Sequence, residues 1–134
     1  MKFALVNNEK TEPSEGARGF CPSCKSEVFA KCGDYRVKHW AHKGNRNCDP
    51  WWEGETEWHR AWKNLFPKEC QENIRTDSAT GEKHIADIKT DKGFVIEFQH
   101  SAIKPDEVKS REDFYKNMVW VVDGTRLPMD FRRF

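Results

Sequence analysis

Alternating apolar and polar positions in the second half of the chain predict strands. Segments 70–75, 82–90 and 93–99 carry β-branched and aromatic residues in this alternation, which is typical of strands with one buried face. The run at 118–122 is apolar without alternation and ends at Gly124. It predicts a strand that is buried on both faces.

Two helices are predicted around these strands. Residues 54–66 have apolar side chains at helical spacing and stop before Pro67. Pro105 is suited to the first turn of a second helix, which runs to about residue 117. The order helix, three-strand meander, helix, strand predicts an α/β fold with helices packed on a small sheet.

The first part of the chain is organised differently. We expect a short strand at 2–6, a polar loop at 8–19 and a hairpin at 27–40. A chain of 134 residues has room for one small core and a metal-stapled module. We therefore divide it into a first module at 1–50 and a core at 51–134.

The charge balance excludes a general polyanion-binding field. Lysine and arginine number 23 against 22 acidic residues, so any site for nucleic acid must be local. No window is apolar over the length of a membrane span, and 34% of residues are charged. We expect a cytoplasmic protein with no membrane contact.

Cysteine and histidine spacing predicts a zinc site. Five cysteines in a reducing compartment favour metal binding over disulfides. The expected structural Zn²⁺ ligands are Cys21, Cys24, His42 and Cys48, with His39 as the alternate histidine. In a strand the two histidines point to opposite faces, whereas in a helix they lie close together. Free cysteines in an apolar core are the alternative, but this segment has few large aliphatic residues.

Basic residues concentrate in the same module. Lys38, Lys43 and Arg46 are interleaved with aromatic side chains, which predicts a surface that binds nucleic-acid phosphates. A solvated charged surface is the alternative interpretation.

A tight hairpin is predicted to set two carboxylates side by side. The sequence Asp-Lys-Gly at 91–93 suits a three-residue loop, and in that register Asp87 lies opposite Glu97, with Gln99 on the same face. Opposed Cβ atoms are about 4.5–5.5 Å apart, where like charges destabilise a sheet. A cation is expected between them, unless Lys89 or solvent relieves the repulsion.

A third carboxylate precedes this hairpin. The sequence GETEWHRAWKNLF spaces Glu55, His59 and Lys63 four residues apart, so they would lie along one side of the predicted helix, at the rim of its apolar face. A ladder of surface charges is the simpler alternative.

These motifs carry a family resemblance. GETEWH with a later lysine, HIADI, VIEFQHS and the downstream Arg111 resemble the nuclease region of CoiA-like competence proteins, a branch of the PD-(D/E)xK restriction-endonuclease-like superfamily. The motifs CPSC and HWAH resemble the N-terminal module of the same family. The resemblance covers residues 20–124 and implies a restriction-endonuclease-like core after a small zinc module.

The resemblance also implies roles for single residues. Asp87, Glu97 and Glu55 would hold Mg²⁺ or Mn²⁺. Gln99 stands where many members have lysine and would position a water, while Lys63 would supply the missing positive charge. His59 is a candidate for proton transfer or phosphate contact, and Ser101 and Arg111 are candidates for phosphate binding.

The expected function is metal-dependent hydrolysis of DNA phosphodiester bonds. A non-catalytic, zinc-organised DNA-binding module is one alternative. A protein-interaction domain that uses exposed Trp51 and Trp52 is another. Small nucleases of this fold often act as dimers, so a homodimer or a partner protein is compatible with the sequence, which shows no interface.

Overall fold

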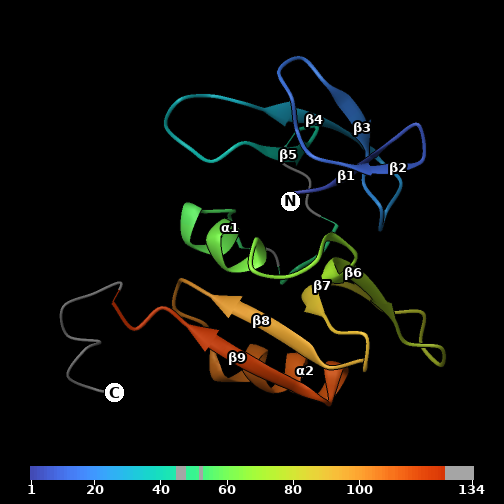
Figure 1. The fold of residues 1–134 in the computed structure, drawn as a ribbon. Helices are drawn as coiled ribbons and strands as arrows, with labels where there is room; N and C mark the ends of the chain where they lie inside the picture. Colours follow the sequence, from blue (N-terminus) through green and yellow to red (C-terminus); the bar gives the residue numbers. More distant parts are fainter. Residues whose placement is uncertain (45–47, 52, 126–134) are drawn as a thin grey trace.

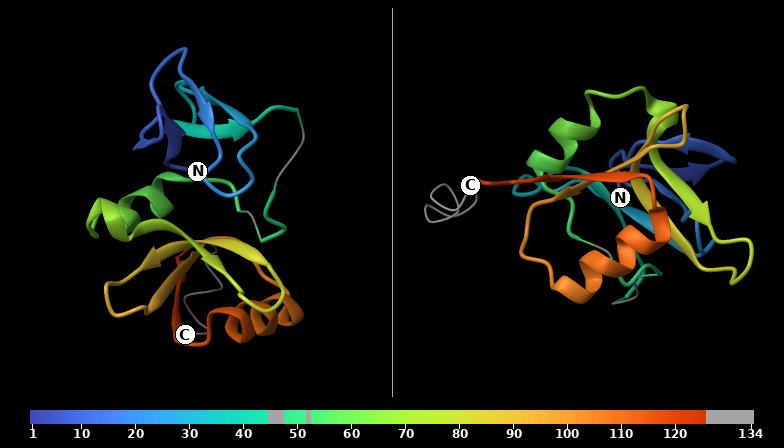
Figure 2. Two further views of the ribbon diagram at one scale, coloured as in Figure 1. Left: turned by 90° about the vertical axis from the view of Figure 1, so that its right-hand side faces the viewer. Right: turned by 90° about the horizontal axis from the view of Figure 1, so that it is seen from below.

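The computed structural model describes residues 1–44, 48–51 and 53–125, which form two sheets and two α-helices (Figure 1). The strand orders are β2-β1-β3-β4-β5 and β6-β7-β8-β9. Helix α1 lies between the two sheets, and helix α2 covers the opposite face of the second sheet (Figure 1, Figure 2). The predicted α/β class is confirmed.

The first sheet is built from short strands. They are β1 (Ala4–Val6), β2 (Glu9–Thr11), β3 (Arg18–Phe20), β4 (Glu27–Lys31) and β5 (His39–His42). Asn7 and Asn8 join β1 to β2 with φ angles of 51° and 62°, which is the left-handed pair that a type I′ turn requires. The loop predicted at 8–19 is therefore wrong in part, because it contains β2 and the start of β3.

The predicted β4–β5 hairpin is confirmed, with Lys31 opposite His39 and a longer connection than expected at 32–38. Its inner side chains form the core of the first sheet. Val28 and Trp40 are buried, and the indole N–H of Trp40 donates to the carbonyl of Thr11 at 3.0 Å. This bond ties β5 to β2 across the module.

The second sheet has the predicted element order. Its elements are α1 (Glu57–Lys63), the 3₁₀ turn η1 (Lys68–Cys70), β6 (Gln71–Thr76), β7 (Lys83–Lys89), β8 (Val95–Gln99), α2 (Pro105–Tyr115) and β9 (Met118–Val122). Strands β6 to β8 are an antiparallel meander, and β9 returns parallel to β8 after α2. Neither α-helix of the described chain is long and apolar enough to span a membrane.

Helix α1 differs from its prediction in start and orientation. It begins after Thr56, whose hydroxyl accepts the N–H of His59 at 3.3 Å, so Glu55 precedes the helix. The buried side chains are His59 and Lys63, whereas Leu65 is 73% exposed. The prediction that the polar residues of this segment lie at the rim of the apolar face is wrong. His59 and Lys63 face into the molecule, where carboxylates pair with Lys63.

Strand β9 lies at the edge of the second sheet. Val119 and Val122 are 43% and 51% exposed, and β9 pairs only with β8 among the described strands. The prediction of a strand buried on both faces is therefore wrong. An apolar run alone does not distinguish a central strand from an edge strand.

Candidate metal centre and carboxylate site

Four side chains of the first module form a metal-binding cluster. The ligand atoms of Cys21, Cys24, His42 and Cys48 all lie within 4.8 Å of one another. The Cys21 and Cys48 sulfurs are 3.7 Å apart, and the Cys24 sulfur lies 3.4 Å from Nε2 of His42. Bonds of about 2.3 Å to sulfur and about 2.0 Å to nitrogen give tetrahedral edges of about 3.5–3.8 Å. The cluster could thus hold zinc, as predicted.

The alternate ligand lies elsewhere. Residues 39–42 form strand β5, so the two histidines point in different directions, and Nδ1 of His39 lies 2.8 Å from the carbonyl oxygen of Val37. His42 is the histidine of the cluster, as the strand interpretation requires.

The cysteine thiols show why the cluster needs a cation. Burial and the nearby sulfur of Cys21 raise the pKa of Cys48 to about 12. Burial also disfavours the thiolate of Cys24, but hydrogen bonds from Ser26 and His42 outweigh it and lower its pKa to about 6. Thiolates this close repel one another, and a bound divalent ion removes that cost.

The hairpin register is confirmed. The N–H of Thr90 donates to the carbonyl of Phe94 at 2.8 Å, and Gly93 adopts φ +81°, as a three-residue loop requires. The strand pairs Ile88–Ile96 and Lys89–Val95 continue this register. One step further along, Asp87 falls opposite Glu97.

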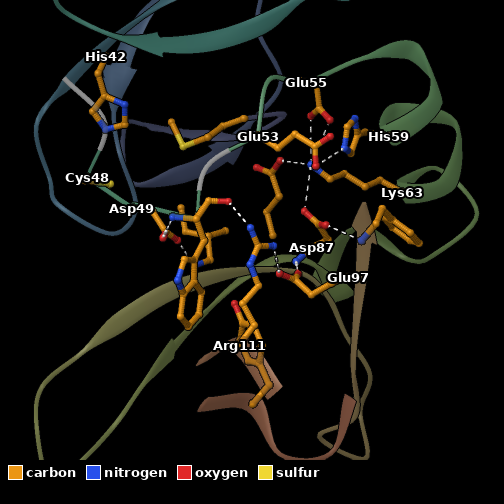
Figure 3. Close-up of a pocket in the computed structure, with 16 residues that line it drawn as sticks. His42, Cys48, Asp49, Glu53, Glu55, His59, Lys63, Asp87, Glu97 and Arg111 are labelled. Carbon is orange, nitrogen blue, oxygen red and sulfur yellow. Dashed lines mark hydrogen bonds and ion pairs between the residues drawn. The ribbon is translucent and has the colours of Figure 1, made fainter. Parts of the chain in front are cut away.

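At Asp87 and Glu97, side-chain carboxylates accept hydrogen bonds from the backbone of the neighbouring strand. The N–H of Asp87 donates to Oε2 of Glu97 at 2.8 Å, and the N–H of Phe98 donates to Oδ2 of Asp87 at 2.9 Å (Figure 3). Each carboxylate therefore has one oxygen on the backbone. The other oxygen faces a side-chain cation, Lys63 at 3.8 Å from Oδ1 of Asp87 and Arg111 at 3.3 Å from Oε1 of Glu97. Burial raises the pKa of both carboxyls, and the neighbouring charge of Asp87 raises that of Glu97 further, well above its ordinary range.

Lys63 is the ammonium nearest to this site. Its Nζ lies 2.8 Å from Oε2 of Glu72, 3.1 Å from Oε2 of Glu55 and 3.8 Å from Oδ1 of Asp87. Burial opposes the charged amine, but these carboxylates raise the pKa of Lys63 above its ordinary value. The predicted proximity of Lys63 to the acids is confirmed, although Glu55 reaches it from outside the helix.

Glu72 is a central residue that sequence reasoning missed. The register of β6 and β7 places it opposite Asp87, and its φ is 50°. Its carboxylate accepts the N–H groups of Lys2 and Phe3 at 2.7 and 3.0 Å. Burial alone would raise the pKa of Glu72, but Lys63 outweighs it and holds the pKa at about 2.

One cavity of about 80 Å³ connects the two centres (Figure 3). Its walls include the zinc-cluster residues His42 and Cys48 together with the predicted acids Glu55, Asp87 and Glu97. Among the described residues, only the cysteine and histidine cluster brings three or more ligand atoms close enough for an ion. Glu55 is instead paired with Lys63 and Arg60, so the three-acid ion site stays a prediction.

The remaining predicted site residues are placed as follows. His59 lines the cavity, with Nδ1 2.7 Å from Oγ1 of Thr56 and Nε2 3.6 Å from Oε2 of Glu53. Gln99 is buried but is not part of the cavity wall, and its side-chain amide donates to the carbonyl of Ser101 at 2.8 Å. Ser101 is exposed, and its N–H donates to Oε1 of Glu53 at 2.7 Å.

Arg111 lies inside the site. It is 5% exposed, and its guanidinium contacts Oε1 of Glu97 at 3.3 Å and Oε2 of Glu107 at 3.0 Å. Its predicted contact with phosphate therefore competes with two carboxylates that are already in place. Arg111 is, in this structure, the positive partner of Glu97.

The basic surface is only partly described. Lys38 and Lys43 are exposed, and Lys43 pairs with Glu27 at 2.8 Å. Arg46 and Trp52 lie outside the described residues. Trp51 stacks on His84 with ring centroids 3.3 Å apart, so the expectation that Trp51 offers an exposed contact surface is wrong.

Three further residues near the two centres are ones that the sequence did not single out. They are Asp49 and Glu53, which line the cavity, and His84, whose Nδ1 lies 2.8 Å from Oδ1 of Asp49. None belongs to a spacing pattern of metal ligands or a helical face. The available signal was the acidic and aromatic run at 49–55, directly after the last cysteine of the cluster.

Comparison with known proteins supports the sequence interpretation. Residues 6–50 match the family model described as Competence protein CoiA, N-terminal domain. The chain is 26% identical to Competence protein CoiA of Bacillus subtilis (strain 168), over 93% of this chain and 36% of that protein. The chain thus spans about a third of the length of this relative. No solved structure is matched. The resemblance to CoiA-like competence proteins is thereby confirmed.

Proposed function

We propose that the chain is a metal-dependent nuclease that hydrolyses DNA phosphodiester bonds, with a restriction-endonuclease-like core at 51–134. The observation that carries the proposal is the Asp87–Glu97 pair. Each carboxylate is fixed by a backbone N–H through one oxygen, and the other oxygen faces the cationic side chain of Lys63 or Arg111. Such rigid pairing of two acids is costly for stability, which favours a functional reason for it.

The charge of the site favours a divalent ion. Six carboxylates line the cavity, whereas its permanently charged side-chain cations are Lys63 and Arg111. Burial raises the pKa of Asp87 and of Glu97, and the charge of Asp87 raises that of Glu97 further, so a bound cation would favour their ionised forms. Their donor chemistry suits Mg²⁺ or Mn²⁺, which would polarise the phosphate and lower the pKa of a bound water.

The chain's own residues would prepare the site. Lys63 contacts Glu55 and Asp87 and holds them close together, and it brings a positive charge to the place where a phosphate would bind. His59, on the cavity wall, would accept or donate a proton. The hydrogen bond from Gln99 to Ser101 would hold the chain in place where strand β8 ends. This is a more direct role for Gln99 than the positioning of a water.

The element order and the relative agree with this proposal. Helix, antiparallel meander, helix and parallel strand is the order that the resemblance implies for the core. The relative is named a competence protein, and the resemblance to CoiA-like competence proteins implies a nuclease that acts on DNA. DNA is therefore the partner that we propose.

A cleavage assay tests the proposal. Purified protein with Mg²⁺ or Mn²⁺ should cut DNA, and single-stranded, duplex and branched substrates should be compared. Asp87→Asn and Glu97→Gln should abolish cleavage while keeping bound zinc and a cooperative thermal transition. Asp91→Asn, at the exposed tip of the same hairpin, is the matched control and should cut like the wild type. Equal cleavage by all four proteins would indicate a contaminating nuclease and refute the assignment.

The second candidate is a non-catalytic DNA-binding module organised by zinc. It is favoured by the position of Lys63, which neutralises acids that would otherwise bind a divalent ion. Calorimetry separates the two candidates. Mg²⁺ binding that is lost in Asp87→Asn supports the nuclease, whereas salt-sensitive DNA binding without any Mg²⁺ binding supports the module.

A further inference from the structure

Segment 48–51 connects the zinc cluster to the carboxylate site. Cys48 is a ligand of the cluster, and Asp49 and Trp51 follow it closely in the chain. All three line the cavity that the two centres share (Figure 3). Any displacement of Cys48 is therefore transmitted to Asp49 and Trp51 through covalent bonds.

Asp49 fixes this segment to strand β7. Its Oδ1 lies 2.8 Å from Nδ1 of His84, and its Oδ2 accepts the N–H of Ile85 at 3.2 Å. His84 is 3% exposed, with Nε2 2.8 Å from Oε1 of Glu82 and its ring stacked on Trp51. A buried imidazole between two carboxylates and an indole has little freedom to move.

Trp51 in turn holds Arg111 of helix α2. Its carbonyl oxygen accepts a hydrogen bond from Nη2 of Arg111 at 2.8 Å, and the guanidinium lies 5.6 Å from the centre of its ring. Nη1 of the same guanidinium lies 3.3 Å from Oε1 of Glu97. The position of Arg111 against Glu97 thus depends on both the backbone and the ring of Trp51.

We propose that segment 48–51 couples zinc binding to the carboxylate site. Zinc-bound Cys48 holds Asp49 and Trp51 in place, and Trp51 positions Arg111 against Glu97. Coupling between two sites is reciprocal, so zinc strengthens the contact of the segment with β7 by the same factor by which that contact strengthens zinc binding. This coupling does not depend on nuclease activity, since it concerns only zinc and the position of Arg111.

Amide hydrogen exchange reports on the coupling. The N–H of Asp87 donates to Glu97, so its exchange rate follows the position of the Glu97 side chain. The N–H of Val95, on the same strand as Glu97, donates to the carbonyl of Asn117 at 2.9 Å and is the internal control. Removal of zinc with a chelator should speed exchange at Asp87 about tenfold and leave Val95 unchanged. Equal exchange at Asp87 with and without zinc would overturn the proposal.

His84→Ala, measured with zinc bound, separates coupling from general unfolding. It should speed exchange at Asp87 about tenfold and raise the Kd for zinc about tenfold in competition with a chromophoric chelator. Tyr35→Ala, at a fully exposed position of the zinc module, should change neither quantity. Wild-type zinc affinity or wild-type exchange at Asp87 in His84→Ala refutes the coupling. If chelation also speeds exchange at Val95, the test of the coupling is the Kd for zinc and the exchange rate at Asp87, both measured on zinc-loaded His84→Ala.

Discussion

Replacement of Lys63 by methionine tests the charge network at the centre of the molecule. Methionine keeps an unbranched side chain that is one atom shorter and leaves Glu55, Glu72 and Asp87 without their ammonium. Lys63 is the largest influence that lowers the pKa of Glu72 from 4.5 to about 2 against the effect of burial. That difference corresponds to about 3 kcal/mol of stability at neutral pH. Lys63→Met should therefore reduce the free energy of unfolding by about 3 kcal/mol, which is in the range for breaking a buried pair.

The pH dependence has a definite sign. A carboxyl whose pKa is lowered by folding stabilises the folded state above pH 4.5, and this contribution is lost as the pH falls toward 2. The difference between wild type and Lys63→Met should thus be largest near pH 7 and should shrink as the pH falls, because without Lys63 burial raises the pKa of Glu72 and the carboxyl takes up a proton. Urea denaturation in excess zinc measures it. Lys109→Met, which removes an exposed lysine paired with Asp113, is the control and should change stability within experimental error. A loss below about 1 kcal/mol for Lys63→Met at pH 7 would refute the reasoning.

Three further predictions follow from the geometry. Glu97→Gln should raise the thermal midpoint at pH 8 without added Mg²⁺, because the raised pKa of Glu97 means that its charge destabilises the fold. The gain should shrink toward pH 5, where the wild-type carboxyl binds the proton. An unchanged or lower midpoint at pH 8 would contradict this. Gly93→Ala should cost about 1 kcal/mol in chemical denaturation because of its left-handed φ, whereas Gly33→Ala, in open space without positive φ, should cost little. Metal analysis should find one zinc per chain in His39→Ala and none in His42→Ala, and the reverse pattern would exclude the cluster described above.

Local chemistry explains which parts of the fold could be predicted from the sequence. The Asp87–Glu97 register was predictable because the loop at 91–93 needs glycine at one position, and a fixed turn fixes every pair that follows. The zinc ligands were predictable because thiolate spacing is set by the geometry of one ion. Strand β2 was missed because its polar residues fall inside the loop predicted at 8–19, although asparagine at positions 7 and 8 tolerates the left-handed conformation of a hairpin turn.

The inward orientation of α1 could not be predicted in the same way. Hydrophobic periodicity assumes that charged side chains face water, and Lys63 faces inward because Glu72 and Glu55 meet it there. Glu72 lies in a strand far from any recognisable motif, so its role depends on the pairing of β6 with β7. Contacts between elements distant in sequence determined these features, and one sequence does not display them.

The carboxylate of Glu72 has a practical consequence for anyone who dissects the protein. It binds the backbone of Lys2 and Phe3 and the ammonium of Lys63 at once, so the residues that precede β1 supply part of the support for the acidic centre. A fragment that starts at residue 51 would lack two of the hydrogen-bond donors that hold Glu72. Such a fragment is expected to lose alignment of its acids even where its own sheet still folds, so the two modules produced by cutting this chain would lack a contact that only the intact chain provides.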